Sequence, residues 1–162
     1  MSDFVDLRDA GRRLAPLLPD DADAIVVAAL PNGAPVAAGL RAVRALPVIG
    51  LEIARTDEGA TALPDDAVAT AIRGRTAIVV DDGVETGTVA RAAAAALAPL
   101  GAARLVLAVP VCPREVEADL ARRYDAIVAC VRPLARRSLA WHFADFDTVD
   151  VTTARSLLAA LS

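Results

Sequence analysis

Two adjacent carboxylates, Asp81 and Asp82, stand directly after a short apolar run at residues 76–80. In open α/β sheets, ligands bind just outside the carboxyl ends of strands, so a strand that ends in two acids is a candidate site. Carboxylates repel a phosphate, and we therefore expect this pair to bind sugar hydroxyl groups or a Mg²⁺ ion that bridges to a diphosphate. Asp81 and Asp82 are the candidate catalytic and metal-binding residues.

The loop that follows the two acids has the composition of an anion-binding loop. Its two glycines allow the chain to turn and a phosphate to approach the backbone closely, and its two threonines add hydroxyl donors. The backbone N–H groups of such a loop, and of the helix after it, attract anions. An ordinary helix N-cap beside an acidic turn is the alternative interpretation. The candidate phosphate-binding residues are Gly83, Val84, Thr86, Gly87 and Thr88.

The elements along the chain must place this loop at the edge of a sheet. Short apolar runs alternate with helical patterns, which predicts an α/β fold with a mostly parallel sheet flanked by helices. The length corresponds to a single domain over residues 1–162. Residues 55–64 are polar and predict a loop, and residues 133–147 are expected to be irregular. Strands are predicted at residues 24–30, 48–54, 76–80, 105–111 and 126–131, and helices at residues 6–18, 36–46, 65–72, 87–97, 113–123 and 152–161.

Charge and composition exclude several classes of partner. The net charge is −4 and no dense basic run occurs, so we expect no nucleic-acid partner. No apolar stretch has the length of a membrane span and the first residues do not resemble a signal peptide, so we expect a cytoplasmic protein with no membrane partner. Cys112 and Cys130 are too few for a disulfide framework or a zinc set, and both are predicted to be small buried hydrophobes.

The order of apolar strand, acid pair and Thr-Gly-Thr sequence resembles the ribose-phosphate motif of the type I phosphoribosyltransferases, whose donor is phosphoribosyl pyrophosphate. Residues 28–37 look like the pyrophosphate loop of this family. Residues 141–146 are similar to the aromatic carboxyl-terminal segment of a bacterial subgroup, in which that segment helps to form a hood over the base. The resemblance covers nearly the whole chain and implies the family's open, mostly parallel sheet with a small C-terminal hood.

The resemblance also implies roles for individual residues. Asp81 and Asp82 would hold the ribose 2′- and 3′-hydroxyl groups, directly or through Mg²⁺. Residues 85–88 would hold the 5′-phosphate, and Glu85 would be a candidate catalytic acid or base. The implied pyrophosphate-loop residues, together with the nearest cation, are Pro31, Asn32, Gly33 and Arg55. The implied base or hood residues are Trp141, His142 and Phe143. Trp141, Phe143 and Phe146 could form a wall facing the base, and could equally form an aromatic core or a dimer contact.

Two departures from the family pattern concern the diphosphate. Asn32 stands where the subgroup commonly has a basic residue, and residues 55–75 form a short, acidic connection where active members have a long flexible loop. Both changes affect stabilisation of the leaving group more than binding of ribose phosphate. A second copy of the chain, in a homodimer, could supply the missing groups across an interface.

Three functions therefore stay open. The first is transfer of a phosphoribosyl group from phosphoribosyl pyrophosphate to a nitrogenous base with Mg²⁺. The second is a catalytically weak or inactive relative that binds phosphoribosyl pyrophosphate or a nucleoside monophosphate, or serves a protein partner. The third is a structural domain that has lost its ligand.

Overall fold

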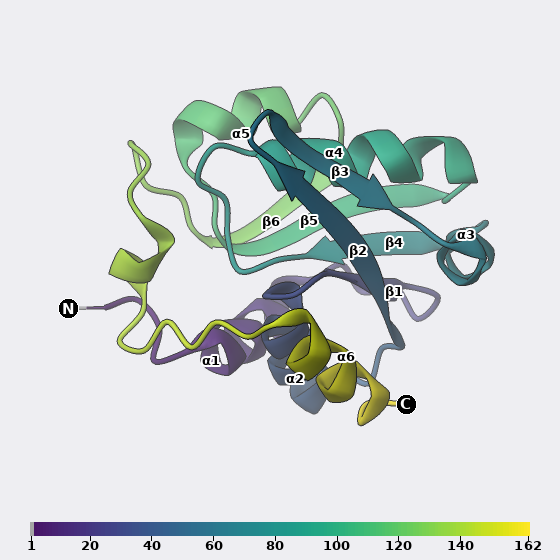
Figure 1. Ribbon diagram of the computed structural model, residues 1–162, viewed down its shortest axis with the longest axis horizontal. Coiled ribbons are helices and arrows are strands. Elements are labelled where there is room, and N and C mark those ends of the chain that lie inside the picture. Colours follow the sequence, from purple (N-terminus) through teal and green to yellow (C-terminus); the bar gives the residue numbers. More distant parts are fainter. Residues whose placement is uncertain (1) are drawn as a thin grey trace.

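The computed structural model describes residues 2–162 and shows a six-stranded sheet with helices on both faces (Figure 1). The strand order is β3-β2-β1-β4-β5-β6, and every neighbouring pair is parallel except β2 with β3. The predicted α/β class with a mostly parallel sheet is confirmed. The strands are β1 (Ile25–Ala29), β2 (Val48–Thr56), β3 (Gly59–Leu63), β4 (Thr76–Val80), β5 (Arg104–Val111) and β6 (Ala126–Val131).

The helices form two layers. Residues of α3, α4 and α5 pack in the core on one face of the sheet, and residues of α1 and α2 pack on the other, where α6 also contacts α2 (Figure 1). None of the helices in residues 2–162 is long and apolar enough to span a membrane. The helices are α1 (Leu7–Leu14), α2 (Gly33–Val43), α3 (Asp66–Ile72), α4 (Thr88–Leu97), α5 (Arg114–Leu120) and α6 (Val151–Ala159), with 3₁₀ turns at Ala15–Leu17, Ala98–Leu100 and Leu139–His142.

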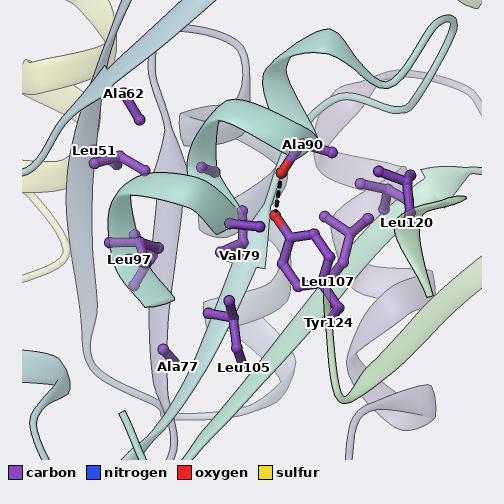
Figure 2. Close-up of a cluster of buried hydrophobic side chains, with 14 of the residues drawn as sticks. Leu51, Ala62, Ala77, Val79, Ala90, Leu97, Leu105, Leu107, Leu120 and Tyr124 are labelled. Atoms are coloured by element: carbon purple, nitrogen blue, oxygen red, sulfur yellow. Dashed lines mark hydrogen bonds between the residues drawn. The ribbon is translucent and has the colours of Figure 1, made fainter. Parts of the chain in front are cut away.

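Strand β4 lies inside the sheet, and all five of its residues are buried. Because side chains alternate between the faces of a strand, Val79 joins the core beside α4, and Ile78 joins the core beside α1 and α2. Figure 2 shows the first of these cores, in which the Tyr124 hydroxyl group donates to the Ala90 carbonyl oxygen at 2.6 Å. This bond fixes the first turn of α4 to the segment that precedes β6.

Residues 55–64 form a hairpin, so the predicted loop is wrong. Strand β2 continues to Thr56 and pairs with β3 from Thr56 with Gly59 back to Glu52 with Leu63. Asp57 and Glu58 make the turn between the strands. The hairpin is polar because much of it is exposed, and exposure does not prevent strand pairing.

Helix α2 begins at Gly33, three residues before the predicted start at residue 36. Pro35 lies in the first turn, where its missing N–H group would have no helical partner in any case. A Cβ atom at Gly33 would lie 2.5 Å from the Val80 carbonyl oxygen. Glycine therefore allows the start of α2 to contact the end of β4.

Helices α1 and α2 approach closely through two glycines. A Cβ atom at Gly11 would collide with the Val36 carbonyl oxygen, and one at Gly39 would collide with the backbone of Arg8. The side chains that flank these contacts belong to the core beneath the sheet. This contact fixes α2, and with it the residues just before α2.

The outer edge of β6 is covered by an arginine. Arg132 donates from Nη1 to the Ala129 carbonyl oxygen at 3.2 Å and from Nη2 to the Ile127 carbonyl oxygen at 2.9 Å. Its Nε is held by Glu117 at 2.6 Å. Edge strands expose unpaired backbone groups that can recruit another strand, and Arg132 satisfies two of them.

Gly39→Ala tests the close packing of α1 on α2. On helix propensity alone, alanine would stabilise α2 by about 1 kcal/mol. Because the added methyl group meets the Arg8 backbone, we expect a loss of about 2–3 kcal/mol in the free energy of unfolding, measured by urea denaturation. Ala42→Gly, at an exposed position of the same helix, is the matched control and should cost about 1 kcal/mol. A Gly39→Ala protein as stable as the wild type would contradict the packing.

Candidate functional site

A cavity of about 520 Å³ lies at the carboxyl ends of β1, β2 and β4. It brings together the acid pair, the whole phosphate-loop set and three of the four residues implied for the diphosphate. Gly33 is the fourth, and it starts α2 just beyond the cavity wall. The lining residues that the sequence indicated are Pro31, Asn32, Arg55, Asp81, Asp82, Gly83, Val84, Glu85, Thr86, Gly87 and Thr88.

The two carboxylates are held close together with little solvent. Asp82 is 8% exposed, and Asp81 is half-buried and accepts the Asp82 N–H group at 2.8 Å. Burial raises the pKa of Asp81 well above its usual range, and the neighbouring Asp82 carboxyl raises it further. Burial also raises the pKa of Asp82, whereas Asp81, Arg55 and Asn32 act in the opposite direction. The pair therefore favours holding a proton until a cation neutralises it.

The phosphate loop presents backbone N–H groups to the cavity. Gly87 is the N-cap of α4 in the left-handed conformation, with φ of 85°, and no side chain caps the helix. The N–H groups of the first helical turn have no partner within a helix, and the helix dipole adds positive potential there. The hydroxyl groups of Thr86 and Thr88 lie 2.9 Å apart at the same place. Val84 differs, because its N–H group donates to the Val111 carbonyl oxygen and fastens the loop to β5.

Glu85 is tied to the C-terminal part of the chain. Its Oε1 accepts the Leu139 N–H group at 2.7 Å, and Leu139 itself packs against Gly83. The carboxylate thus holds the 3₁₀ turn Leu139–His142 on the phosphate loop. A role as acid or base would have to compete with this hydrogen bond.

The diphosphate side of the cavity carries little positive charge. Arg55, at the exposed end of β2, is the one cationic side chain among the described lining residues. Asn32 is neutral, and its Oδ1 already accepts the Val149 N–H group at 3.0 Å. The Asn32 amide also lowers the pKa of Asp82, which lines the same cavity. The Asn32 Oδ1 atom is therefore already engaged by the protein.

The expected base or hood residues need a correction, because Trp141, His142 and Phe143 do not line the cavity. Trp141 is 53% exposed and lies under the Arg137 guanidinium at 4.4 Å. His142 is 2% exposed, with Nδ1 2.7 Å from a carboxylate oxygen of Asp3. Phe143 is buried in the core.

The physical reason is a long-range pairing between the two ends of the chain. Phe4 donates its N–H group to the His142 carbonyl oxygen and accepts the Ala144 N–H group. This pairing turns Phe143 inward, between Phe4 and Phe146 at ring distances of 5.3 and 5.1 Å.

Leu139 and Phe146 form the cavity wall in this part of the chain. Phe146 is the one member of the expected aromatic wall that lines the cavity. No pattern in the sequence indicated Leu139 as a residue of the site. We refer below to residues 143–149, which carry Phe146 to the cavity, as the closing segment.

No protein-family model matches the chain. Two Mycobacterium tuberculosis proteins with the provisional name phosphoribosyl transferase are each 40% identical to it over 62 residues. The match covers 38% of this chain and only 14% of each of those longer proteins.

Solved structures of several proteins share the fold. A Thermus thermophilus protein is 21% identical with a TM-score of 0.82, and the match covers 100% of both chains. A Neisseria gonorrhoeae protein with bound ppGpp is 15% identical with a TM-score of 0.63, over 99% of this chain and 98% of that one. An adenine phosphoribosyltransferase from Thermoanaerobacter pseudethanolicus is 17% identical with a TM-score of 0.60, over 76% and 77%. The chain therefore has the type I phosphoribosyltransferase fold, as its sequence motifs predicted.

Asp81→Asn is expected to stabilise the protein. At a pH below the pKa that Asp81 has in the unfolded chain, its carboxyl is protonated, and therefore neutral, in both the folded and the unfolded protein. As the pH rises through the raised pKa of the folded protein, ionising this buried group costs stability. Asparagine keeps the acceptor for the Asp82 N–H group without the charge.

Thermal unfolding as a function of pH measures this effect. The melting temperature of Asp81→Asn should exceed that of the wild type at neutral pH, by about 2–4 °C per kcal/mol, and the difference should vanish in acid. Asp57→Asn, at the exposed hairpin turn, should change nothing. An Asp81→Asn protein that melts below the wild type at neutral pH would show that the carboxylate is well accommodated.

Proposed function

We propose that the protein binds a ribose 5-phosphate ligand, as phosphoribosyl pyrophosphate or a nucleoside monophosphate, and transfers its phosphoribosyl group to a nitrogenous base. The main support for this proposal is that two carboxylates, Asp81 and Asp82, and a loop rich in N–H groups lie together at the end of β4. The fold supports it, since an adenine phosphoribosyltransferase has the same fold. A ligand with a phosphate next to a sugar diol matches this arrangement, because the loop can bind the phosphate and the carboxylates can bind the two hydroxyl groups.

Each part of the ligand has a matching part of the cavity. The 5′-phosphate would accept hydrogen bonds from residues 83–88 and from the first turn of α4. The ribose hydroxyl groups would donate to Asp81 and Asp82. In the transfer, the bond from C1′ to the diphosphate oxygen breaks and the diphosphate leaves with the electron pair. The bond from C1′ to the base nitrogen forms, and the proton of that nitrogen passes to the released diphosphate or to water. Carboxylates beside the ribose favour the positive charge that develops on the sugar ring.

Mg²⁺ fits this donor set together with the ligand. No group of three or more His, Cys, Asp or Glu side chains suited to a metal occurs within residues 2–162. Mg²⁺ is commonly held by one or two carboxylates plus substrate phosphates, and Asp81 and Asp82 supply two carboxylates. When bound, the ion would neutralise negative charge on the acid pair and on a diphosphate.

A second candidate function is ligand binding without turnover. The Asn32 side chain is engaged by the protein, and Arg55 is the only cation on the described cavity wall. In place of a long loop, a hairpin with the acidic turn Asp57 and Glu58 stands beside the cavity. Stabilisation of a leaving diphosphate would therefore depend on Mg²⁺. A nucleotide ligand is also consistent with the fold, since the Neisseria gonorrhoeae protein holds ppGpp.

Calorimetric titration tests the ligand class. Wild-type protein should bind phosphoribosyl pyrophosphate with Mg²⁺ and at least one of a panel of nucleoside monophosphates and ppGpp. Asp82→Asn should weaken binding about tenfold or more, because it removes a charged hydrogen-bond acceptor. Asp57→Asn is the matched control and should bind as the wild type. Absence of binding to the whole panel would reject the proposal.

Diphosphate release in the presence of a panel of purine and pyrimidine bases then separates the two candidates. Release that depends on Asp81 and Asp82 supports transfer. Tight binding with no release from any base supports the binding function.

Arg55→Ala is expected to discriminate between ligands. Affinity for phosphoribosyl pyrophosphate should fall by about tenfold, because a charge-assisted contact is lost, and affinity for a nucleoside monophosphate should fall less. Arg73→Ala removes the same charge at an exposed position beyond α3, before β4 begins, and should affect neither ligand. Equal losses for both ligands with Arg55→Ala would place Arg55 at the 5′-phosphate.

A further inference from the structure

Asn32 uses its side chain in an unusual way. It occupies the N-cap of α2, where an asparagine ordinarily accepts a hydrogen bond from an N–H group of its own helix. Here the side chain makes no such bond. It reaches instead to Val149, more than a hundred residues further along the chain, whose N–H group donates to Asn32 Oδ1 at 3.0 Å.

The other end of the same amide faces the acid pair. Asn32 and Asp82 line the same cavity, and hydrogen bonding by the Asn32 amide lowers the pKa of the Asp82 carboxyl. With Oδ1 engaged by Val149, the NH₂ group is the part of the amide that can donate to a carboxylate. One amide therefore stands between the candidate ribose-binding acid and the C-terminal part of the chain.

The closing segment has few anchors, and Asn32 is the one that adjoins the cavity. Near its start, the Ala144 and Asp145 N–H groups donate to the Phe4 and Val5 carbonyl oxygens, each at 2.8 Å. In its middle, Asp147 Oδ1 accepts the Leu7 N–H group at 3.0 Å. At its end, Val149 binds Asn32. Phe146 meets the cavity between these anchors.

The end of the segment is also fixed by packing. Val149 packs against a small cluster formed by Leu30, Ala34 and Ala154. Leu30 and Ala34 flank Asn32 in the sequence, and Ala154 belongs to α6. Asn32 thus lies within a joint between β1, α2 and α6.

From these contacts we infer that Asn32 is a positioning residue whose amide couples occupation of the Asp82 site to the closing segment. This inference rests on the proposed function, because the ligand enters through the same acid pair. A ligand or metal ion that engages Asp82 changes what the Asn32 NH₂ group can bind. Because the amide is rigid and planar, a rotation that moves its NH₂ group also moves Oδ1. The hydrogen bond from the Val149 N–H group to Oδ1 then changes. The ribose end of a ligand is thereby linked to the wall that carries Phe146.

Backbone amide signals in NMR spectra test the coupling directly. The ¹⁵N-labelled full chain is titrated with ribose 5-phosphate in the presence of MgCl₂, and the amides of Gly83 and Val149 are followed. Gly83 lines the cavity and reports binding, whereas Val149 lies outside the cavity lining and reports the coupling. In the wild type, both signals should shift with one midpoint.

Two variants of Asn32 separate its contacts. Asn32→Ala removes both, and we expect about tenfold weaker binding, a Gly83 shift at saturation and no ligand-dependent shift at Val149. Asn32→Asp keeps an acceptor for Val149 but replaces the donor that faces Asp82. It should also lose the Val149 response, and it stands in for Asn32→Ala if that protein does not fold.

Asp147→Ala is the matched control, because it releases the closing segment from Leu7 without touching Asp82. It should keep the Val149 response. A Gly83 shift without a Val149 shift in the wild type overturns the coupling and leaves the proposed function standing. No shift at either amide overturns the proposed function and the coupling with it. A Val149 response that survives in both Asn32 variants removes Asn32 from the path.

Discussion

Strand β4 has apolar cores on both faces and strands along both edges, and this burial determines where polar chemistry can occur. Five buried residues leave no place for a charge until the strand ends. Asp81 and Asp82 occupy the first positions beyond it, still surrounded by protein, and their pKa values are raised mainly by burial. Buried carboxylates cost stability unless they are neutralised. Groups with perturbed pKa values tend to gather at functional sites, and here the perturbation follows from the strand that delivers them.

Local sequence sufficed for β4 and its loop, because a continuous apolar run, two acids and glycines at the turn are all short-range signals. Local sequence failed to predict the features whose structure depends on solvent exposure or on contacts between residues far apart in the chain. The polar hairpin of β2 and β3 resembles a loop in composition. The cavity-facing side chain of the aromatic segment is Phe146, and this depends on pairing with Phe4 at the other end of the chain. The engagement of Asn32 by Val149 is equally invisible to a local pattern.

The cavity is acidic and has little cationic side-chain support, which sets the physical character of binding. Charge on a phosphate would be met by N–H dipoles and a metal ion more than by arginine. Such binding is directional and depends on the exact placement of the loop. That placement is fixed from several sides, by Val111 behind the loop, by Tyr124 at the first turn of α4, and by Leu139 above Gly83.

The two rims of the sheet are unequal, and this has a consequence for association. Arg132 blocks the backbone of β6, whereas β3 is the opposite edge of the sheet. If two copies joined through their β3 strands, each would turn its blocked rim outward. Strand addition at the outward β6 edge would then have to displace Arg132 from the Ile127 and Ala129 carbonyl oxygens. The arginine therefore disfavours fibres built by strand addition at this edge.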